Sequence, residues 1–225
     1  MKKILCVGYR DWALNIYKKI SQDYNNGSVV IISNYDEYSD EFVKEYHPDI
    51  ILFYGWSWII SKSIVSTYKC IMLHPSKLPK YRGGSPIQNQ IIRGESDSAV
   101  TLFLMNENMD SGPIVFQESM SLSGTINDIF NRIEELGYKG TMEFLDSPTN
   151  GVIQIEKNAT YFERRTEEQS EITIKELKEQ SAEYIYNKIR MLQDPYPNAF
   201  IHAVDGKKYL SLRLILRIKK NREIR

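Results

Sequence analysis

The sequence is poor in cysteine and has no excess of charge of either sign. Two cysteines occur among 225 residues, and both Cys6 and Cys70 lie in short apolar runs. Such runs are typical of buried, reduced thiols, so we expect neither a disulfide nor a metal site. Lysines plus arginines equal aspartates plus glutamates at 29 each, which gives a formal net charge of zero. This balance argues against a nucleic acid as the main partner, because binding to phosphates needs a basic excess or a basic face.

Long apolar runs are also missing. No stretch approaches the ~18 residues that a membrane-spanning helix needs, so we expect no membrane segment. Residues 1–11 combine a basic pair with a short apolar run, but Arg10 and Asp11 follow too soon for a signal peptide. We interpret this start as a first strand and expect a cytoplasmic protein. The glycine pattern GxGxxG of dinucleotide-binding proteins is absent as well.

The first third of the chain alternates between apolar runs and amphipathic stretches. Four runs predict strands and three stretches between them predict helices: strands at 4–7, 28–32, 49–53 and 70–73, helices at 12–20, 36–46 and 59–68. This order predicts an α/β fold with a Rossmann-like, mostly parallel sheet. In such sheets the binding crevice lies at the carboxyl ends of the strands.

The pattern changes after this alternation. Two short runs around a polar connection, 99–104 and 113–118, predict an antiparallel hairpin that joins the sheet. Residues 126–145 then carry apolar side chains at helical spacing, with Thr125 in front of them. A long amphipathic helix is therefore expected at the end of this part of the chain.

A domain boundary is predicted at the segment Ser-Pro-Thr-Asn-Gly, residues 147–151. It separates a catalytic domain, 1–150, from a C-terminal extension, 151–225. The extension is expected to contain one charged helix at 174–192 and a β-hairpin that turns at Asp205–Gly206. A short, half-apolar hairpin is marginal in water alone. We therefore expect it either to pack on the domain or to form a homodimer interface.

The most informative stretch is CIMLHPSKLPKYRGGSPIQNQ, residues 70–90. It begins as a buried strand and reaches His74, one of three histidines, where strand character ends. Prolines and glycines then follow in a number that predicts an irregular loop rather than a regular element. Long loops after buried strands commonly carry the binding and catalytic residues of α/β proteins. His74 is therefore a strong candidate for a functional residue.

The segment HPSKLPKYRGGSPIQNQI, followed by MDSGPIVFQ, resembles the folate-dependent formyltransferases. This family includes enzymes that formylate methionyl-tRNA, glycinamide ribonucleotide and amino sugars. Its motif joins His-Pro/Gly-Ser-x-x-Pro to a later Asp-x-Gly-Pro-Ile. The reaction needs a base for the attacking amine and donors for a tetrahedral oxyanion. The resemblance implies that His74 and Asp110 are catalytic, with His74 taking the proton and Asp110 orienting its ring, and that 10-formyltetrahydrofolate is the formyl donor.

One position departs from the family pattern. The family usually has asparagine two residues before the histidine, where its amide helps to hold the formyl oxygen. Met72 stands there and cannot donate a hydrogen bond. Either another donor serves, with the backbone, His74 and Gln88 as candidates, or the chain is a non-catalytic homologue that binds folate or a nucleotide sugar. We favour an active enzyme.

The resemblance also implies two sets of binding residues. Those expected at the folate are Trp58, Ile59, Ile60, Asn106, Glu107, Asn108 and Met109. Those expected at the acceptor substrate are Tyr9, Arg10, Tyr54, Trp56, Ser76, Lys80, Arg82, Gly83, Gly84, Ser85, Gln88 and Tyr196. Within the second set the two basic loop residues, Lys80 and Arg82, are expected at a pyrophosphate. A cis peptide bond is expected at Leu78–Pro79.

The acceptor is suggested by three further segments, YGWSW, YFERRT and IRMLQDPYPNAF. They resemble sugar N-formyltransferases, most closely those that act on dTDP-4-amino-4,6-dideoxyglucose. This similarity implies a formamido sugar for a surface polysaccharide, such as the O-antigen of lipopolysaccharide. Methionyl-tRNA or a purine precursor is the alternative acceptor.

Overall fold

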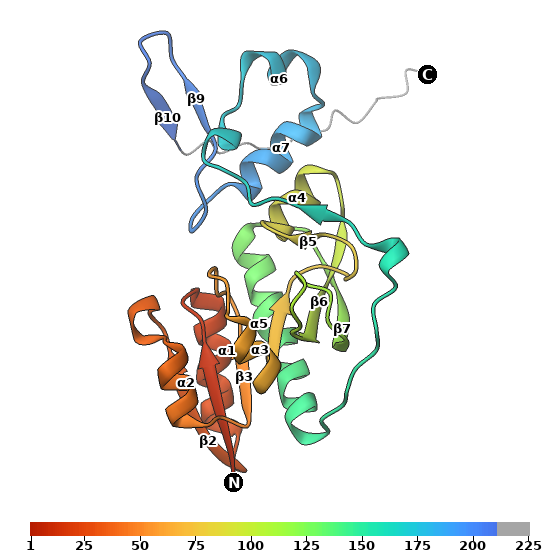
Figure 1. Ribbon diagram of the computed structural model, residues 1–225. Coiled ribbons are helices and arrows are strands. Elements are labelled where there is room, and N and C mark those ends of the chain that lie inside the picture. Colours follow the sequence, from red (N-terminus) through yellow and green to blue (C-terminus); the bar gives the residue numbers. More distant parts are fainter. Residues whose placement is uncertain (211–225) are drawn as a thin grey trace.

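A six-stranded sheet forms the centre of the molecule in the computed structural model, which describes residues 1–210 (Figure 1). Its strands are β1 (Lys2–Val7), β2 (Gly27–Ile32), β3 (Ile50–Phe53), β4 (Lys69–His74), β6 (Asp97–Leu104) and β7 (Ile114–Ser121). Their order is β2-β1-β3-β4-β6-β7. The first four run parallel, whereas β6 and β7 form an antiparallel hairpin beside β4. This arrangement confirms the predicted α/β fold and its mostly parallel sheet.

Helices cover both faces of this sheet. Helices α1 (Asp11–Asp23) and α5 (Ile126–Asp146) pack together on one face. Helices α2 (Asp40–Tyr46) and α3 (Lys62–Thr67) supply buried residues to a second apolar cluster. Alternate residues of β1 divide between the two clusters, because successive side chains of a strand point to opposite faces. Coverage of both faces explains why the parallel strands are continuous apolar runs.

The predicted irregular loop at 70–90 needs correction, because its last part is helical. Helix α4 runs over Pro86–Ile92, and its residues 87–92 are all buried. Pro86 occupies the first helical position, where a missing N–H leaves no hydrogen bond unmade. Ser85 precedes it in a left-handed conformation, with φ of 49°. The proline that suggested a break in fact begins a helix.

The predicted helix at 174–192 also differs, since it is two helices. Helix α6 covers Ile174–Glu179 and α7 covers Ala182–Met191. Ser181 lies between them in an extended conformation, and its side chain accepts a hydrogen bond from the backbone N–H of Tyr184. A serine cap of this kind favours a new helix start over continuation of the preceding one.

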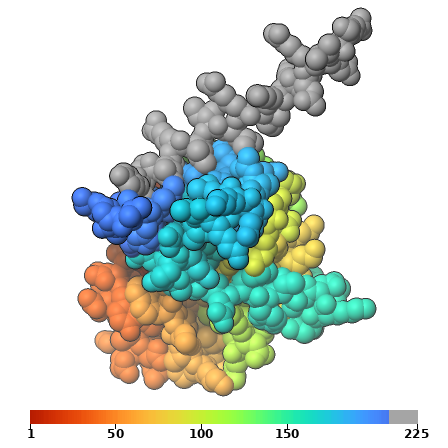
Figure 2. Space-filling view, turned by 90° about the horizontal axis from the view of Figure 1, so that it is seen from above, coloured from red at the N-terminus to blue at the C-terminus, as the bar shows by residue number. Residues whose placement is uncertain are grey.

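The C-terminal extension lies over the carboxyl ends of the parallel strands (Figures 1 and 2). Its helix α7 packs on α4. The remaining elements are β5 (Arg82–Gly83) paired with β8 (Tyr161–Phe162), the hairpin β9 (Phe200–His202) and β10 (Lys208–Leu210), and short turns η1 (Tyr35–Glu37), η2 (Glu156–Asn158) and η3 (Glu168–Ser170). The rest of the predicted hairpin, 211–218, lies outside the described residues. The domain boundary and the homodimer stay predictions.

No helix within residues 1–210 has both the length and the apolar character to cross a membrane.

Ile133 provides a test of the packing between α5 and the sheet. Its side chain is completely buried in the cluster shared by α1, α5 and the sheet. Replacing Ile133 by Ala is expected to lower the free energy of unfolding by about 2–5 kcal/mol, through lost burial and the cavity left behind. Urea denaturation measures the change. The matched substitution Ile174→Ala, at a side chain that is 70% exposed on α6, should change it by less than about 0.5 kcal/mol. Equal losses would contradict this packing.

Candidate active site

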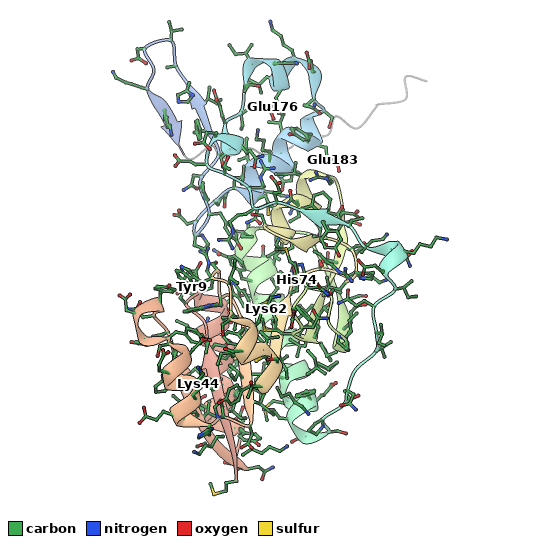
Figure 3. The ribbon with its side chains drawn as sticks, viewed as in Figure 1. Tyr9, Lys44, Lys62, His74, Glu176 and Glu183 are labelled. Carbon is green, nitrogen blue, oxygen red and sulfur yellow. The ribbon has the colours of Figure 1, made fainter. Side chains whose placement is uncertain are left out.

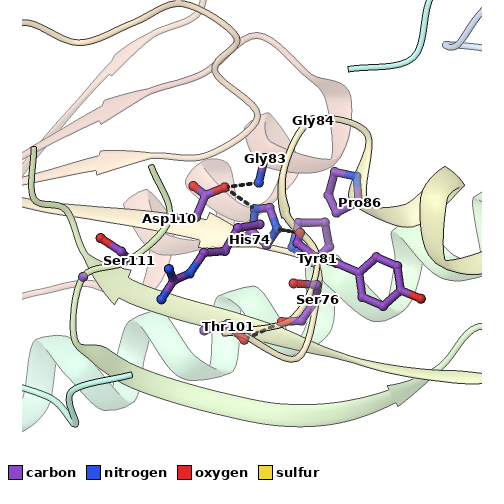
Figure 4. Close-up of polar contacts among 12 residues, drawn as sticks. His74, Ser76, Tyr81, Gly83, Gly84, Pro86, Thr101, Asp110 and Ser111 are labelled. Carbon is purple, nitrogen blue, oxygen red and sulfur yellow. Dashed lines mark hydrogen bonds and ion pairs between the residues drawn. The ribbon is translucent and has the colours of Figure 1, made fainter. Parts of the chain in front are cut away.

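His74 and Asp110 meet where the parallel strands end (Figures 3 and 4). His74 is the last residue of β4, and Asp110 lies in the loop between β6 and β7. The Nδ1 atom of His74 is 3.5 Å from Oδ2 of Asp110, and the two side chains are only 6% and 10% exposed. The structure therefore brings together the two residues predicted to be catalytic.

The second ring nitrogen of His74 determines where the hydrogen lies. Nε2 is 2.7 Å from the carbonyl oxygen of Tyr81. A carbonyl oxygen can only accept a hydrogen bond, so Nε2 carries the hydrogen and donates it. In the neutral ring Nδ1 is then the basic nitrogen, and it faces Asp110. A proton taken up by Nδ1 is placed beside a carboxylate oxygen.

Asp110 is held in an unusual backbone conformation. Its φ is 49°, in the left-handed region that residues other than glycine rarely adopt. Its carboxylate accepts a hydrogen bond from the backbone N–H of Gly83, at 2.7 Å. Its carbonyl oxygen accepts from Nε2 of Gln154 at 2.9 Å, and the same nitrogen donates to the carbonyl of Gly112 at 2.8 Å. The carboxylate and the backbone carbonyl of Asp110 are thus both held by residues outside its own turn.

Arg82 requires a correction, because its guanidinium is used inside the fold. The residue is fully buried. Its Nε and Nη2 donate to Oε1 of Gln154 at 3.2 and 2.9 Å. Its Nη1 donates to the carboxylate of Glu156 at 2.9 Å and to the hydroxyl of Tyr161. These hydrogen bonds lower the pKa of Glu156. With its donors engaged in this way, Arg82 is not presented to a pyrophosphate.

Two other predicted substrate contacts also belong to the interior. Tyr54 is fully buried, its hydroxyl lies 2.8 Å from that of Thr141, and its ring stacks on Tyr17 at 5.4 Å. Burial raises the pKa of Tyr54. Ser76 is fully buried as well, and its hydroxyl donates to the carbonyl of Lys80 at 2.7 Å. Both side chains therefore bond to other parts of the protein interior beside the site.

The loop before α4 is in close contact with the extension. A Cβ on Gly83 or Gly84 would collide with the backbone of residues 162–165, so glycine is needed for this approach. The hydroxyl of Ser85 accepts a hydrogen bond from the same segment. Lys80 is exposed. Ligand contacts by these loop residues stay predictions. The peptide bond Leu78–Pro79 is cis, as predicted.

An ion pair at the surface connects the regions of the two segments predicted to bind folate. Lys62, two residues after the first segment, pairs with Glu107 of the second at 3.0 Å. Asn106 shapes the second segment by accepting hydrogen bonds from the backbone of Asn108 and the hydroxyl of Ser111, both at 3.0 Å. In the first segment Ile60 is buried. The large apolar side chains that these segments leave exposed are Trp58, Ile59 and Met109.

Aromatic side chains gather at the ends of β1 and β3. The ring of Tyr9 is 6.4 Å from Trp56 and 5.1 Å from Trp58, and the two indoles are 4.7 Å apart. The tryptophans that were predicted at different ligands therefore form one cluster. The indole N–H of Trp56 is buried and has no hydrogen-bond partner within residues 1–210.

Arg10 connects this cluster to the extension. Its guanidinium is 4.8 Å from the ring centre of Tyr9 and 5.6 Å from that of Tyr196. Gln88, on α4, is 2% exposed, and its side chain lies beside Tyr196, whose pKa burial raises and the contact with Gln88 lowers. The structure thus brings Tyr9, Arg10 and Tyr196 together as predicted neighbours of the substrate.

Two residues of the extension, Gln154 and Glu156, were missed by the sequence interpretation. Tyr161 opens the segment YFERRT, which was noted only for its resemblance and not for a contact with Arg82. Gln154 is 8% exposed, whereas the flanking Ile153 and Ile155 are 81% and 66% exposed. Isoleucine is usually buried and glutamine exposed, so nothing in the sequence indicated that Gln154 is buried.

Comparison with known proteins decides the family. Residues 11–145 match the family model described as formyl transferase. A methionyl-tRNA formyltransferase of Ehrlichia ruminantium is 37% identical over 172 residues, which cover 74% of this chain and 54% of the relative. The chain belongs to the formyl transferase family. It spans about half the length of the curated relatives it matches.

Solved structures show the same fold. Methionyl-tRNA formyltransferase from Clostridium thermocellum is 33% identical with a TM-score of 0.83, and the match covers 96% of this chain and 99% of that one. Two structures share the fold at 19% identity and a TM-score of 0.77. A 4-N formyltransferase from Francisella tularensis matches over 96% of this chain and 99% of its own. HypX from Aquifex aeolicus, in complex with tetrahydrofolic acid, matches over 93% and 37%.

The internal role of Arg82 can be tested by stability. Arg82→Met keeps much of the side-chain volume but removes every donor to Gln154 and Glu156. Leaving the buried amide oxygen unpaired is expected to lower the free energy of unfolding by about 1–3 kcal/mol. Chemical denaturation measures this change. Lys80→Met, at an exposed neighbour in the same loop, should stay within about 0.5 kcal/mol of the native chain. An unchanged stability in Arg82→Met would contradict the internal role.

Proposed function

We propose that the chain transfers a formyl group from 10-formyltetrahydrofolate to the amine of a nucleotide-linked amino sugar. The observation that carries the proposal is the His74–Asp110 pair, with Nδ1 of His74 facing the carboxylate. A cytoplasmic location and a homodimer through the hairpin accompany this proposal as predictions.

The proposed reaction uses the His74–Asp110 pair to take the proton that the amine loses. The substrate amine attacks the formyl carbon, and a new C–N bond forms as the oxygen becomes an oxyanion. Nδ1 of His74 takes a proton from the amine, and the charged ring then lies beside Asp110. Collapse of the intermediate breaks the bond from the formyl carbon to the folate nitrogen, which takes a proton as tetrahydrofolate leaves. Amine and donor are thus converted to a formamide and tetrahydrofolate.

A donor is also needed where the family has asparagine. Met72 is half-buried among apolar side chains of the sheet and cannot fill this role. Among the alternatives, Nε2 of His74 is engaged by the carbonyl of Tyr81. The backbone and Gln88 are the other candidates. We propose Gln88, because its side chain is buried on α4 beside Tyr196, in the region proposed for the acceptor.

The exposed apolar side chains suit the formyl donor. Ile59 is 99% exposed and Met109 is 65% exposed, and they belong to the two segments that Lys62 and Glu107 link. A flat heterocycle such as a pterin gains from covering such side chains. Large apolar groups left open at a strand end are consistent with a ligand surface. We propose folate binding along these segments.

The acceptor proposal rests on the aromatic cluster and Arg10. A nucleotide-linked sugar presents a flat base, which suits Tyr9 and Trp56, and a diphosphate, which suits a guanidinium. The segments YGWSW and IRMLQDPYPNAF contribute Trp56 and Tyr196 to this region. We propose dTDP-4-amino-4,6-dideoxyglucose as the acceptor, which gives a formamido sugar for a surface polysaccharide.

Methionyl-tRNA is the second candidate acceptor. It is favoured by the 37% identity to the Ehrlichia relative, which carries that activity in its name. The formal net charge of zero opposes it, because tRNA binding normally needs a basic surface.

Formyl transfer to each acceptor tests the proposal. The purified chain is incubated with 10-formyltetrahydrofolate and either the dTDP-linked amino sugar or methionyl-tRNA, and the formylated product is detected by mass spectrometry. We expect product with the sugar. His74→Asn should lower kcat by at least about 100-fold, as loss of a general base does. His47→Asn, at an exposed left-handed position that asparagine tolerates, is the matched control and should retain full activity.

Two results would contradict parts of this proposal. Product from methionyl-tRNA alone would replace the acceptor and leave the reaction intact. Binding of nucleotide sugar or folate without any product would favour the non-catalytic homologue instead.

A further inference from the structure

A side chain beyond the residues matched by the family model holds the turn that carries Asp110. Gln154 lies 8% exposed between Arg82 and the backbone of the β6–β7 loop. We propose that Gln154 is a positioning residue that keeps the Asp110 carboxylate facing His74. This inference deepens the proposed function and rests on it.

The amide of Gln154 uses all of its hydrogen-bonding capacity. Its oxygen accepts from Nε and Nη2 of Arg82, at 3.2 and 2.9 Å. Its nitrogen donates to the carbonyl oxygens of Asp110 and Gly112, at 2.9 and 2.8 Å. A guanidinium can only donate and a carbonyl can only accept, so the amide has one acceptable orientation. Gln154 is therefore fixed between a donor group and two acceptors.

The orientation of the Gln154 amide matters because these contacts form a closed ring that includes His74 and Asp110. His74 donates through Nε2 to the carbonyl of Tyr81, and the next residue is Arg82. Arg82 donates to Gln154, which donates to the backbone of Asp110. Asp110 returns to His74 through its carboxylate. Movement of any member is thus transmitted to the pair.

The other side of Arg82 is anchored in the extension. Nη1 bonds both carboxylate oxygens of Glu156, at 3.0 and 2.9 Å, and the hydroxyl of Tyr161. Glu156 is 69% exposed, so this anchor is partly solvated, whereas Gln154 is enclosed. Gln154 and Glu156 therefore offer a matched comparison, because both accept from Arg82 but only Gln154 contacts the Asp110 turn.

Removal of the two N–H donors has a defined consequence. The carbonyl oxygens of Asp110 and Gly112 would then face the same buried position without a hydrogen-bond donor. Buried carbonyl oxygens without a donor are costly, so the turn should relax and draw the carboxylate away from Gly83 and His74. Tyr9, Arg10 and Trp56, which are proposed at the acceptor, are not part of this ring. The effect should therefore appear in kcat and not in KM for the amino-sugar nucleotide.

Two substitutions separate the donor function of Gln154 from its role as a partner of Arg82. Gln154→Met removes donor and acceptor at similar length. Gln154→Glu keeps an acceptor for Arg82 and replaces the donor. Both are expected to lower kcat by up to about 100-fold, the size of effect that an ångström-scale misplacement produces. KM for the amino-sugar nucleotide should not change. Glu156→Gln should retain the kcat of the native chain.

Amide hydrogen exchange provides a readout that needs no turnover. The Gly83 N–H is held by the Asp110 carboxylate, whereas the neighbouring Gly84 N–H is held by the carbonyl of Phe162. In Gln154→Met, exchange at Gly83 should accelerate about fivefold or more, as loss of one hydrogen bond permits. Gly84 is the internal control and should keep its native rate.

The outcomes separate this inference from the proposed function. If Gly83 exchange accelerates but no acceptor is formylated by the native chain, the positioning role stands and the proposed reaction fails. Native activity in Gln154→Glu, or unchanged exchange at Gly83, would overturn the positioning role. Equal acceleration at Gly83 and Gly84 would do so as well, because it would indicate general loosening of the segment.

Discussion

The left-handed backbone at Asp110 is the constraint on which the site depends. Aspartate adopts such a conformation more readily than most residues other than glycine, and surrounding contacts fix the orientation of its side chain. Here the carboxylate is held by Gly83 and the carbonyl by Gln154. Both come from segments distant from the β6–β7 loop, which makes the orientation of Asp110 toward His74 a property of the tertiary fold.

The parallel sheet and the extension each contribute part of this region. Strand ends deliver Tyr9 and His74 to one edge, as expected for parallel strands. The extension then covers that edge, with α7 on α4 and β8 on β5. The family model matches residues 11–145, yet Gln154 and Tyr196 lie beyond it. The region proposed for reaction and acceptor therefore extends past the part of the chain that defines the family.

Much of this architecture follows from local patterns in the sequence. Continuous apolar runs were sufficient for the parallel strands, and the two motifs singled out His74 and Asp110. The interpretation of Pro86 as a break was wrong because proline is compatible with both a break and a helix start. Arg82 was placed at a pyrophosphate because it is a basic residue of the loop, whereas its partners lie more than 70 residues away in sequence. Gln154 gave no signal, because burial there is set by tertiary contacts and not by periodicity.

The tautomer of His74 is the most direct measure of the chemistry. Nitrogen NMR of the uniformly labelled chain distinguishes the two ring nitrogens, and His74→Asn identifies their signals by loss. At a pH where the ring is neutral, we predict that the hydrogen is on Nε2, donated to Tyr81, and that Nδ1, which faces Asp110, carries none. A hydrogen found on Nδ1 would contradict this arrangement, since Nδ1 could not then serve as the base.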